Sequence, residues 1–183
     1  MIKMVDPNTA LFNQAYDALY HKVTSYVIAK CSNITDVQDI VQEIFIELYR
    51  VIQARGAEYI KNTEALAMRI AKTKLYHYYK TKKRRTKEIP LYARTNEGKE
   101  YERAELCDID IEERYLNTHT VREVWRIISQ KPADVQKVFA LYYYLDLQIG
   151  EIAKTLNISE SAVKRRLYDT LKEIRNIYKK EGE

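Results

Sequence analysis

Proline, which interrupts helices more strongly than any other residue, occurs at only three positions in this chain. Pro7, Pro90 and Pro132 all fall between stretches whose apolar residues recur at spacings of three and four, so the missing N–H costs no helix hydrogen bond. Only four glycines occur, and no alternation of apolar and polar residues is long enough to build a sheet. The sequence predicts an all-α fold.

The length and composition allow a buried core under a charged surface. The 183 residues have room for one medium domain or two small ones. Hydrophobic residues make up 46% and charged residues 31%, which indicates a folded chain. The formal net charge of +5 fits a protein that binds a polyanion, but many basic proteins bind no nucleic acid. Whether the protein binds nucleic acid therefore has to be judged from where the charges lie along the chain.

Several classes of protein find no support in the sequence. No apolar run approaches the roughly 20 residues of a membrane span, and the N-terminus has no signal-peptide pattern, so we expect a cytoplasmic protein with no membrane insertion of its own. Cys31 and Cys107 are far apart, and the histidines are equally scattered, which predicts no metal site and no cofactor. Neither clustered carboxylates nor a nucleophile beside a base suggests catalytic residues, so we expect no enzyme.

The charge changes sign along the chain. Residues 69–87 carry nine cations and no carboxylate, whereas the residues after 96 are dominated by Asp and Glu. Turn-forming residues and few apolar ones mark residues 88–110 as an acidic, flexible linker. We therefore predict two small helical domains, residues 1–87 and 111–183, joined by this linker.

Residues 36–52 show the strictest helical periodicity. Asp36 is predicted to cap this helix, and one face is predicted to be buried through Val37, Ile40, Val41, Ile44, Phe45, Leu48 and Ile52. A second row at the same spacing consists of Asp39, Gln42, Glu43 and Ile46, continued by Tyr49 and Arg50. Either Ile46 packs under a neighbouring helix and the acids are merely solvated, or the row docks a basic partner around an apolar centre.

Residues 64–85 form a basic helix with aromatic residues between the cations. Its inner face is predicted to hold Ala67, Ile70, Ala71, Lys74 or Leu75, and Tyr78. Cations release counterions from phosphates and aromatic rings stack on unpaired bases, so this helix is a candidate for opened DNA. The candidate residues are Arg69, Lys72, Tyr76, Tyr79, Lys80, Lys82, Lys83 and Arg84. The alternatives are a solvated helix end and tyrosine used as a general filler, since the chain has 16 tyrosines.

The C-terminal domain is predicted to begin with two amphipathic helices. The first covers residues 111–129, and the second follows Pro132. Their predicted core residues are Val121, Val124, Trp125 and Ile128 in the first helix, and Val135, Val138, Phe139, Tyr142 and Leu145 in the second.

Two further elements predict a helix-turn-helix. "QIGEIAKTL" is followed by the tight connection "NIS" and by a second helix, in which Asn157 can adopt a left-handed conformation and Ser159 can accept an N–H. The second helix is anchored by Val163, Leu167, Thr170 or Leu171, and Ile174. Its outward residues are candidates for DNA contact, with Arg166 near the edge: Ser161, Lys164, Arg165, Arg166 and Tyr168.

Three segments, in this order, resemble an extracytoplasmic-function (ECF) sigma factor of bacterial RNA polymerase, a class with only regions 2 and 4 of the sigma-70 family. "DVQDIVQEIFIELYR" is similar to the polymerase-binding helix, "RIAKTKLYHYYKTKKRR" to the segment that melts the promoter and reads the −10 element, and "LQIGEIAKTLNISESAVKRRL" to the −35-reading helix-turn-helix. The resemblance covers about residues 12–178.

The resemblance implies a sigma factor that binds core RNA polymerase and promoter DNA and is held inactive by an anti-sigma factor. It implies that Asp39, Gln42 and Glu43 contact the polymerase clamp, and that residues 53–63 capture a flipped base of the non-template strand. It also implies that the acidic linker threads through channels of the polymerase. The rival hypothesis is a stand-alone helix-turn-helix regulator with an N-terminal interaction domain.

Four positions depart from the family pattern. Ala65 stands where a bulky aromatic residue is usual and His77 where an aspartate is common, so the −10 preference is not transferred by analogy. Asn157 replaces the usual turn glycine, and Gly150 weakens the local helix propensity.

Overall fold

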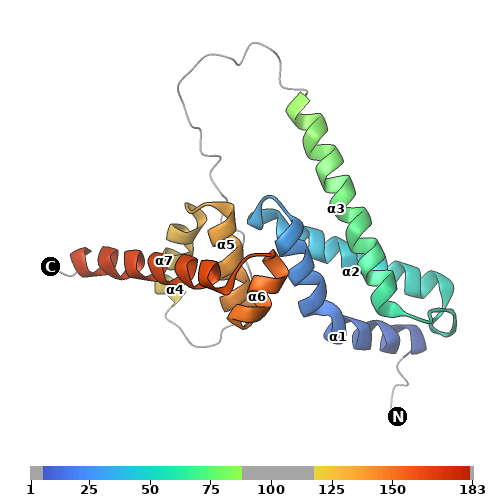
Figure 1. Cartoon of the computed structure of the whole chain (residues 1–183). Coiled ribbons are helices and arrows are strands. Elements are labelled where there is room, and N and C mark those ends of the chain that lie inside the picture. Colours follow the sequence, from blue (N-terminus) through green and yellow to red (C-terminus); the bar gives the residue numbers. More distant parts are fainter. Residues whose placement is uncertain (1–5, 88–117, 182–183) are drawn as a thin grey trace. The chain divides into compact units, whose positions relative to one another are not determined.

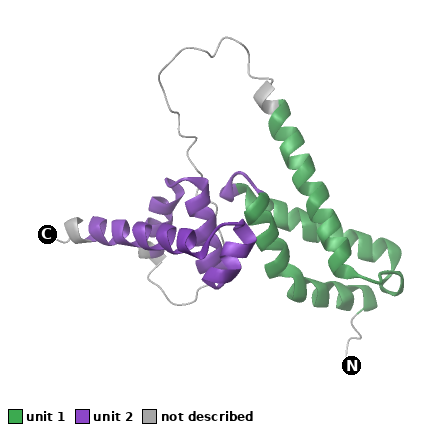
Figure 2. Ribbon diagram, viewed as in Figure 1, with its two compact units in different colours: residues 1–30, 36–103 green, residues 31–35, 104–183 purple. Residues whose placement is uncertain are grey.

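The computed structural model of the chain describes residues 6–87 and 118–181 (Figure 1). Every regular element in these two ranges is a helix, which confirms the all-α prediction. The helices form two compact units, α1 to α3 and α4 to α7 (Figure 2). The predicted linker at 88–110 and the predicted helix start at residue 111 lie outside the described residues.

The first unit is built from three long helices, and the segments between them are short. The helices are α1 (Pro7–Lys30), α2 (Val37–Arg55) and α3 (Thr63–Lys87), with short 3-10 turns η1 (Ile34–Asp36) and η2 (Ala57–Tyr59) before α2 and α3. Pro7 is the first residue of α1, where its missing N–H is harmless, and Asp6 caps the helix by accepting the Thr9 N–H at 3.1 Å. The core lies where the three helices meet.

Helix α2 buries the face that its periodicity predicts. All seven expected residues, from Val37 to Ile52, are buried. The predicted cap by Asp36 is wrong, because its side chain makes no capping hydrogen bond. Its carboxylate instead accepts the Tyr78 hydroxyl of α3 at 2.6 Å. Asp36 therefore links the start of α2 to the middle of α3.

Helix α3 packs small and aliphatic residues inward. Ala67, Ile70, Ala71 and Leu75 are buried, so Leu75 rather than Lys74 completes the apolar face. The small alanines let α3 lie close to its neighbours, and Tyr78 is half-buried beyond them.

The second unit consists of four helices and one wider turn. The helices are α4 (Thr118–Ser129), α5 (Ala133–Phe139), α6 (Ile149–Leu156) and α7 (Glu160–Glu181), with η3 (Ala140–Tyr144) following α5. All of these elements contribute fully buried residues, among them Ile128, Val138, Phe139, Leu141, Ile152 and Val163. Leu167, Thr170 and Ile174 continue the inner face of α7, so Thr170 rather than Leu171 is the buried anchor.

The prediction that Tyr142 is a core residue is wrong. The segment η3 is a π-helical turn, in which the Leu145 N–H donates to the Ala140 carbonyl at 3.3 Å. This wider turn shifts the residues after Phe139 from α-helical spacing. Leu141 is buried in place of Tyr142, whose side chain is exposed.

The helix-turn-helix forms as predicted from local chemistry. Asn157 ends α6 with φ 56° and ψ 49°, the left-handed conformation that asparagine tolerates. The Ile158 N–H then donates to the Ala153 carbonyl at 3.0 Å, which closes the turn. Ser159 accepts the Ala162 N–H at 3.2 Å and so caps α7.

None of the described helices combines the length and apolar composition that spanning a bilayer requires.

Candidate functional site

The second row of α2 lies on the surface of the first unit. Asp39, Gln42 and Glu43 are exposed, and Ile46 keeps 43% of its area accessible. The interpretation in which Ile46 packs under a neighbouring helix is therefore wrong. A large aliphatic side chain lies open among acidic and amide groups, an arrangement suited to a partner that brings both apolar area and positive charge.

The two flanks of this row differ in character. On the side of α3, the Glu43 carboxylate lies 3.3 Å from the Lys74 ammonium. On the side of α1, Tyr49 packs its ring edge-on against Phe12, with centroids 5.1 Å apart. One flank is thus an ion pair and the other an aromatic cluster.

The outer face of α3 presents the cations and rings that the sequence predicts. All eight candidates are exposed, and Tyr76 keeps 64% of its area accessible. Two of them also make contacts within the unit: the Tyr79 hydroxyl donates to the Lys30 carbonyl, and the Lys82 ammonium donates to the Tyr78 hydroxyl at 3.2 Å. The first contact holds α3 against the end of α1, and the second lies within α3.

The predicted loop at residues 53–63 is shorter than expected, because residues 53–55 form the last turn of α2. Gly56 ends that helix with φ 85°, a conformation that favours glycine. Asn8 of α1 accepts the next N–H, from Ala57, at 2.7 Å. Tyr59 projects from the loop with 73% of its area exposed. The loop is therefore anchored at its start and open at its tip.

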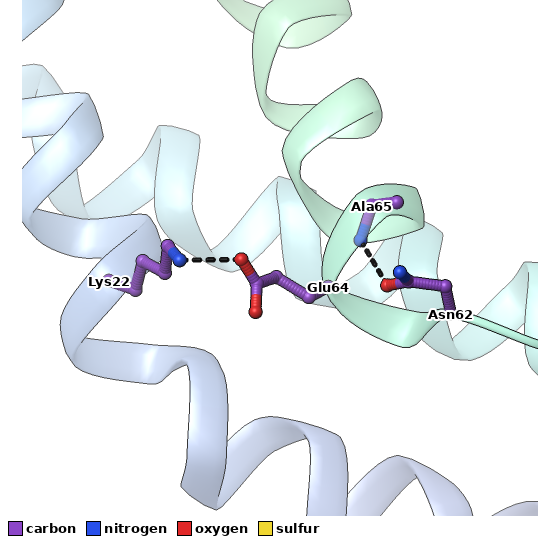
Figure 3. A network of polar contacts seen from close by, with 4 residues as sticks. All are labelled: Lys22, Asn62, Glu64 and Ala65. Carbon is purple, nitrogen blue, oxygen red and sulfur yellow. Dashed lines mark hydrogen bonds and ion pairs between the residues drawn. The ribbon is translucent and has the colours of Figure 1, made fainter.

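The other end of this loop is fixed at the start of α3 (Figure 3). The Asn62 side chain caps α3 by accepting the Ala65 N–H at 2.8 Å. The next carboxylate, Glu64, forms an ion pair with Lys22 of α1. The position of Ala65, where the family pattern has an aromatic ring, is thus an exposed first-turn position beside this ion pair.

The outer face of α7 carries the predicted DNA-facing residues of the second unit. Ser161, Lys164, Arg165 and Tyr168 are exposed, and Tyr168 keeps 61% of its area accessible. Arg166 lies at the edge, as predicted, where its guanidinium pairs with Asp134 of α5 at 2.6 Å. The charge of Arg166 is therefore partly neutralised within the unit.

Two cations that the sequence interpretation missed continue this face. Lys172 and Arg175 are exposed at the same spacing of three and four, seven residues after Arg165 and Tyr168 respectively. Their spacing of three and four is visible in the sequence, but the predicted DNA-contact residues ended at Tyr168. On η3, burial and then Tyr142 raise the pKa of the Tyr143 hydroxyl above its usual value, and Arg175 only partly opposes the shift.

Each of the two units matches the model of a known protein family. The family model for sigma-70 region 2 matches residues 11–85, and the model for sigma-70 region 4 matches residues 122–174. Together they cover more than half of the chain. The chain belongs to the sigma-70 family. The predicted ECF sigma factor, with regions 2 and 4 in this order, is confirmed. This sigma factor binds core RNA polymerase and promoter DNA and directs promoter-specific transcription initiation.

This chain also resembles the sigma factor of one solved structure, but this likeness is weaker than the family matches. The chain is 12% identical to the sigma factor RpoE of Bartonella quintana, which that structure contains in complex with the anti-sigma factor NepR. The match covers 92% of this chain and 96% of that one, with a TM-score of 0.45. At this degree of likeness, the assignment rests on the two family regions. No curated protein sequence matches this one.

Proposed function

We propose that this sigma factor docks on core RNA polymerase through Asp39, Gln42, Glu43 and Ile46 of α2. The observation that carries the proposal is the open side chain of Ile46, 43% exposed at the centre of an otherwise polar row. Removing this apolar area from water on binding would add affinity, while the two carboxylates steer a basic surface toward it.

The basic face of α3 then holds the −10 region and the opened strand. Cations at Arg69, Lys72, Lys80, Lys82, Lys83 and Arg84 neutralise phosphates, and the rings of Tyr76 and Tyr79 stack on unpaired bases. In the second unit, Lys164 and Arg165 reach base edges of the −35 element from the major groove. Ser161, Arg166 and Tyr168 contact the backbone around them.

The proposed domain limits are residues 1–87 for the region 2 unit and 111–183 for the region 4 unit, with an acidic linker at 88–110. The factor acts by binding in the cytoplasm and catalyses no bond change itself. An anti-sigma factor would inactivate it by covering the α2 row and the DNA-facing surfaces.

Run-off transcription with bacterial core polymerase, on a pool of promoter fragments from the same genome, tests this function. The wild-type protein should give discrete new transcripts, and Asp39→Ala with Glu43→Ala should abolish them while leaving thermal unfolding unchanged. Ile46→Asp should do the same, because this exposed position tolerates a carboxylate in the free protein.

Asp17→Ala is the matched control, since it removes an exposed carboxylate of the same unit from α1 and should keep full transcription. Loss of transcripts with Asp17→Ala, or normal core binding by Ile46→Asp in a pull-down, would contradict the assignment of the α2 row.

A further inference from the structure

The exposed face of α7 continues well past the residues assigned to the −35 element. Ser161, Arg165, Tyr168, Lys172 and Arg175 follow one another at spacings of three and four, Lys164 lies beside Arg165, and all six are exposed. Residues at this spacing share one side of a helix. The row contains no carboxylate and extends over about 21 Å at the rise of an α-helix.

The carboxylates of α7 lie off this row. Asp169 and Glu173 are four residues apart on a neighbouring side, and Glu173 pairs with Lys131 of the segment between α4 and α5. On the same side, Arg166 pairs with Asp134. Within the described residues, Lys164, Arg165, Lys172 and Arg175 have no ion-pair partner. The unit thus neutralises the cations on one side of α7 and leaves those on the other side available.

The row is longer than the groove that its first half is proposed to enter. From Ser161 to Tyr168 the helix advances about 10 Å, similar to the width of the major groove, about 12 Å. Lys172 and Arg175 lie about 6 and 10 Å farther along the axis. If Tyr168 lies at the edge of the groove, these two cations would lie beyond it, within reach of the flanking phosphates.

Tyrosine hydroxyls extend the surface at its far end. Tyr143 of η3 lies near Arg175, stacks on the buried ring of Phe139 with centroids 5.6 Å apart, and is 53% exposed. Tyr142 packs edge-on against it at 4.9 Å. The π-helical turn presents these two rings at the surface. A hydroxyl beside a guanidinium suits a phosphate oxygen as a ligand.

We propose that Lys172 and Arg175, with the hydroxyl of Tyr143, form a second contact to the phosphate backbone of promoter DNA, next to the −35 element. This inference rests on the proposed placement of Lys164 and Arg165 in the major groove. The contact sets affinity and the position of the unit on the duplex, and it carries no base preference of its own.

The test measures promoter binding by holoenzyme, reconstituted from core polymerase and the full chain, over a series of salt concentrations. Lys172→Ala with Arg175→Ala should lower affinity by on the order of tenfold and reduce the slope of log K against log salt by about 2, since each phosphate contributes about 0.9. The loss should be equal on promoters with an intact or altered −35 element. Ethylation of the phosphates next to the −35 element should interfere with binding by the wild type but not with binding by this variant.

The control is Arg122→Ala with Arg126→Ala, which removes two exposed cations from α4 and should leave the slope unchanged. Arg165→Ala separates the two proposals, because it should reduce the preference for the −35 sequence. If Arg165→Ala has that effect but the Lys172 and Arg175 pair changes nothing, the second contact is wrong and the proposed function stands.

If neither variant changes DNA binding, the placement of α7 on DNA is wrong as well. A weaker pull-down of core polymerase by the Lys172 and Arg175 variant, with an unchanged salt slope, would overturn the DNA contact in favour of an acidic protein surface.

Discussion

Glu43 of α2 and Lys74 of α3 form an ion pair with 3.3 Å between carboxylate and ammonium, so a proposed polymerase contact touches the helix proposed to hold DNA. The Glu43 side chain remains 63% exposed, whereas that of Lys74 is 27% exposed. The carboxylate can therefore reach a cation on the polymerase while Lys74 stays largely covered.

The first prediction separates these two roles of Glu43. Glu43→Ala should weaken core binding by about tenfold, both in the wild type and in a Lys74→Ala background. Lys74→Ala alone should change the free energy of unfolding by less than about 1 kcal/mol, because the pair is partly solvated. Titration with core polymerase measures the affinity, and urea unfolding measures the stability, of the two single variants and the double variant. If Glu43→Ala has no effect once Lys74 is absent, Glu43 acts only through Lys74.

The second prediction concerns the hydrogen bond from Tyr78 to Asp36. Tyr78→Phe removes the donor at 2.6 Å and leaves a half-buried carboxylate with one partner fewer. We expect the free energy of unfolding to fall by about 1–2 kcal/mol, as is usual for hydrogen bonds to charged groups. Tyr76→Phe is the control, because that ring is exposed on the same helix and should cost almost nothing. Equal effects of the two changes in urea unfolding would contradict the role of the bond.

The third prediction concerns Thr24 in the second half of α1. Its hydroxyl is buried and has no hydrogen-bond partner among the described residues. Thr24→Val keeps the shape, removes the unsatisfied group and should raise stability by about 1 kcal/mol. Thr24→Ser keeps the hydroxyl, loses a buried methyl and should lower stability by a similar amount. Thermal unfolding of both variants measures the difference, and a destabilised valine variant would show that the hydroxyl is satisfied in solution.

The fourth prediction compares two glycines. A Cβ at Gly150 in α6 would meet only the carboxylate end of the exposed Glu160 side chain, at 3.2 Å, and that end can move aside. Gly150→Ala should therefore stabilise the second unit by about 0.5–1 kcal/mol through helix propensity. Gly56→Ala should destabilise the first unit, because φ is 85° there. Urea unfolding of the two variants measures the change in the free energy of unfolding. A change of the same sign in both would contradict the prediction.

The elements that the sequence predicts well are those in which one helix face decides burial. The seven inward residues of α2 follow from strict periodicity, and the turn at Asn157 follows from local backbone preferences. The errors come from contacts that no local pattern encodes. Asp36 loses its capping role to Tyr78, 42 residues away, and Tyr142 turns outward because a π-helical turn interrupts the spacing.

The candidate surfaces were predicted as rows of exposed residues, but their internal pairing was not. Exposure follows from position on a helix, so Asp39, Ile46 and Arg165 were all found from spacing. That Arg166 is engaged by Asp134, and Glu43 by Lys74, depends on which helices become neighbours. Pairing therefore required the three-dimensional arrangement.

The ion pairs of Arg166 with Asp134 and of Lys131 with Glu173 have a consequence for how the second unit meets DNA. They lie along the side of α7 next to the cationic row and pair the cations there, while Lys164, Arg165, Lys172 and Arg175 in the row keep their positive charge. In the field of a duplex, such an uneven charge distribution favours the orientation in which the cationic side faces the DNA. The unit would thus turn its recognition side toward the helix before any base is touched, and fewer encounters would be wasted in the wrong orientation.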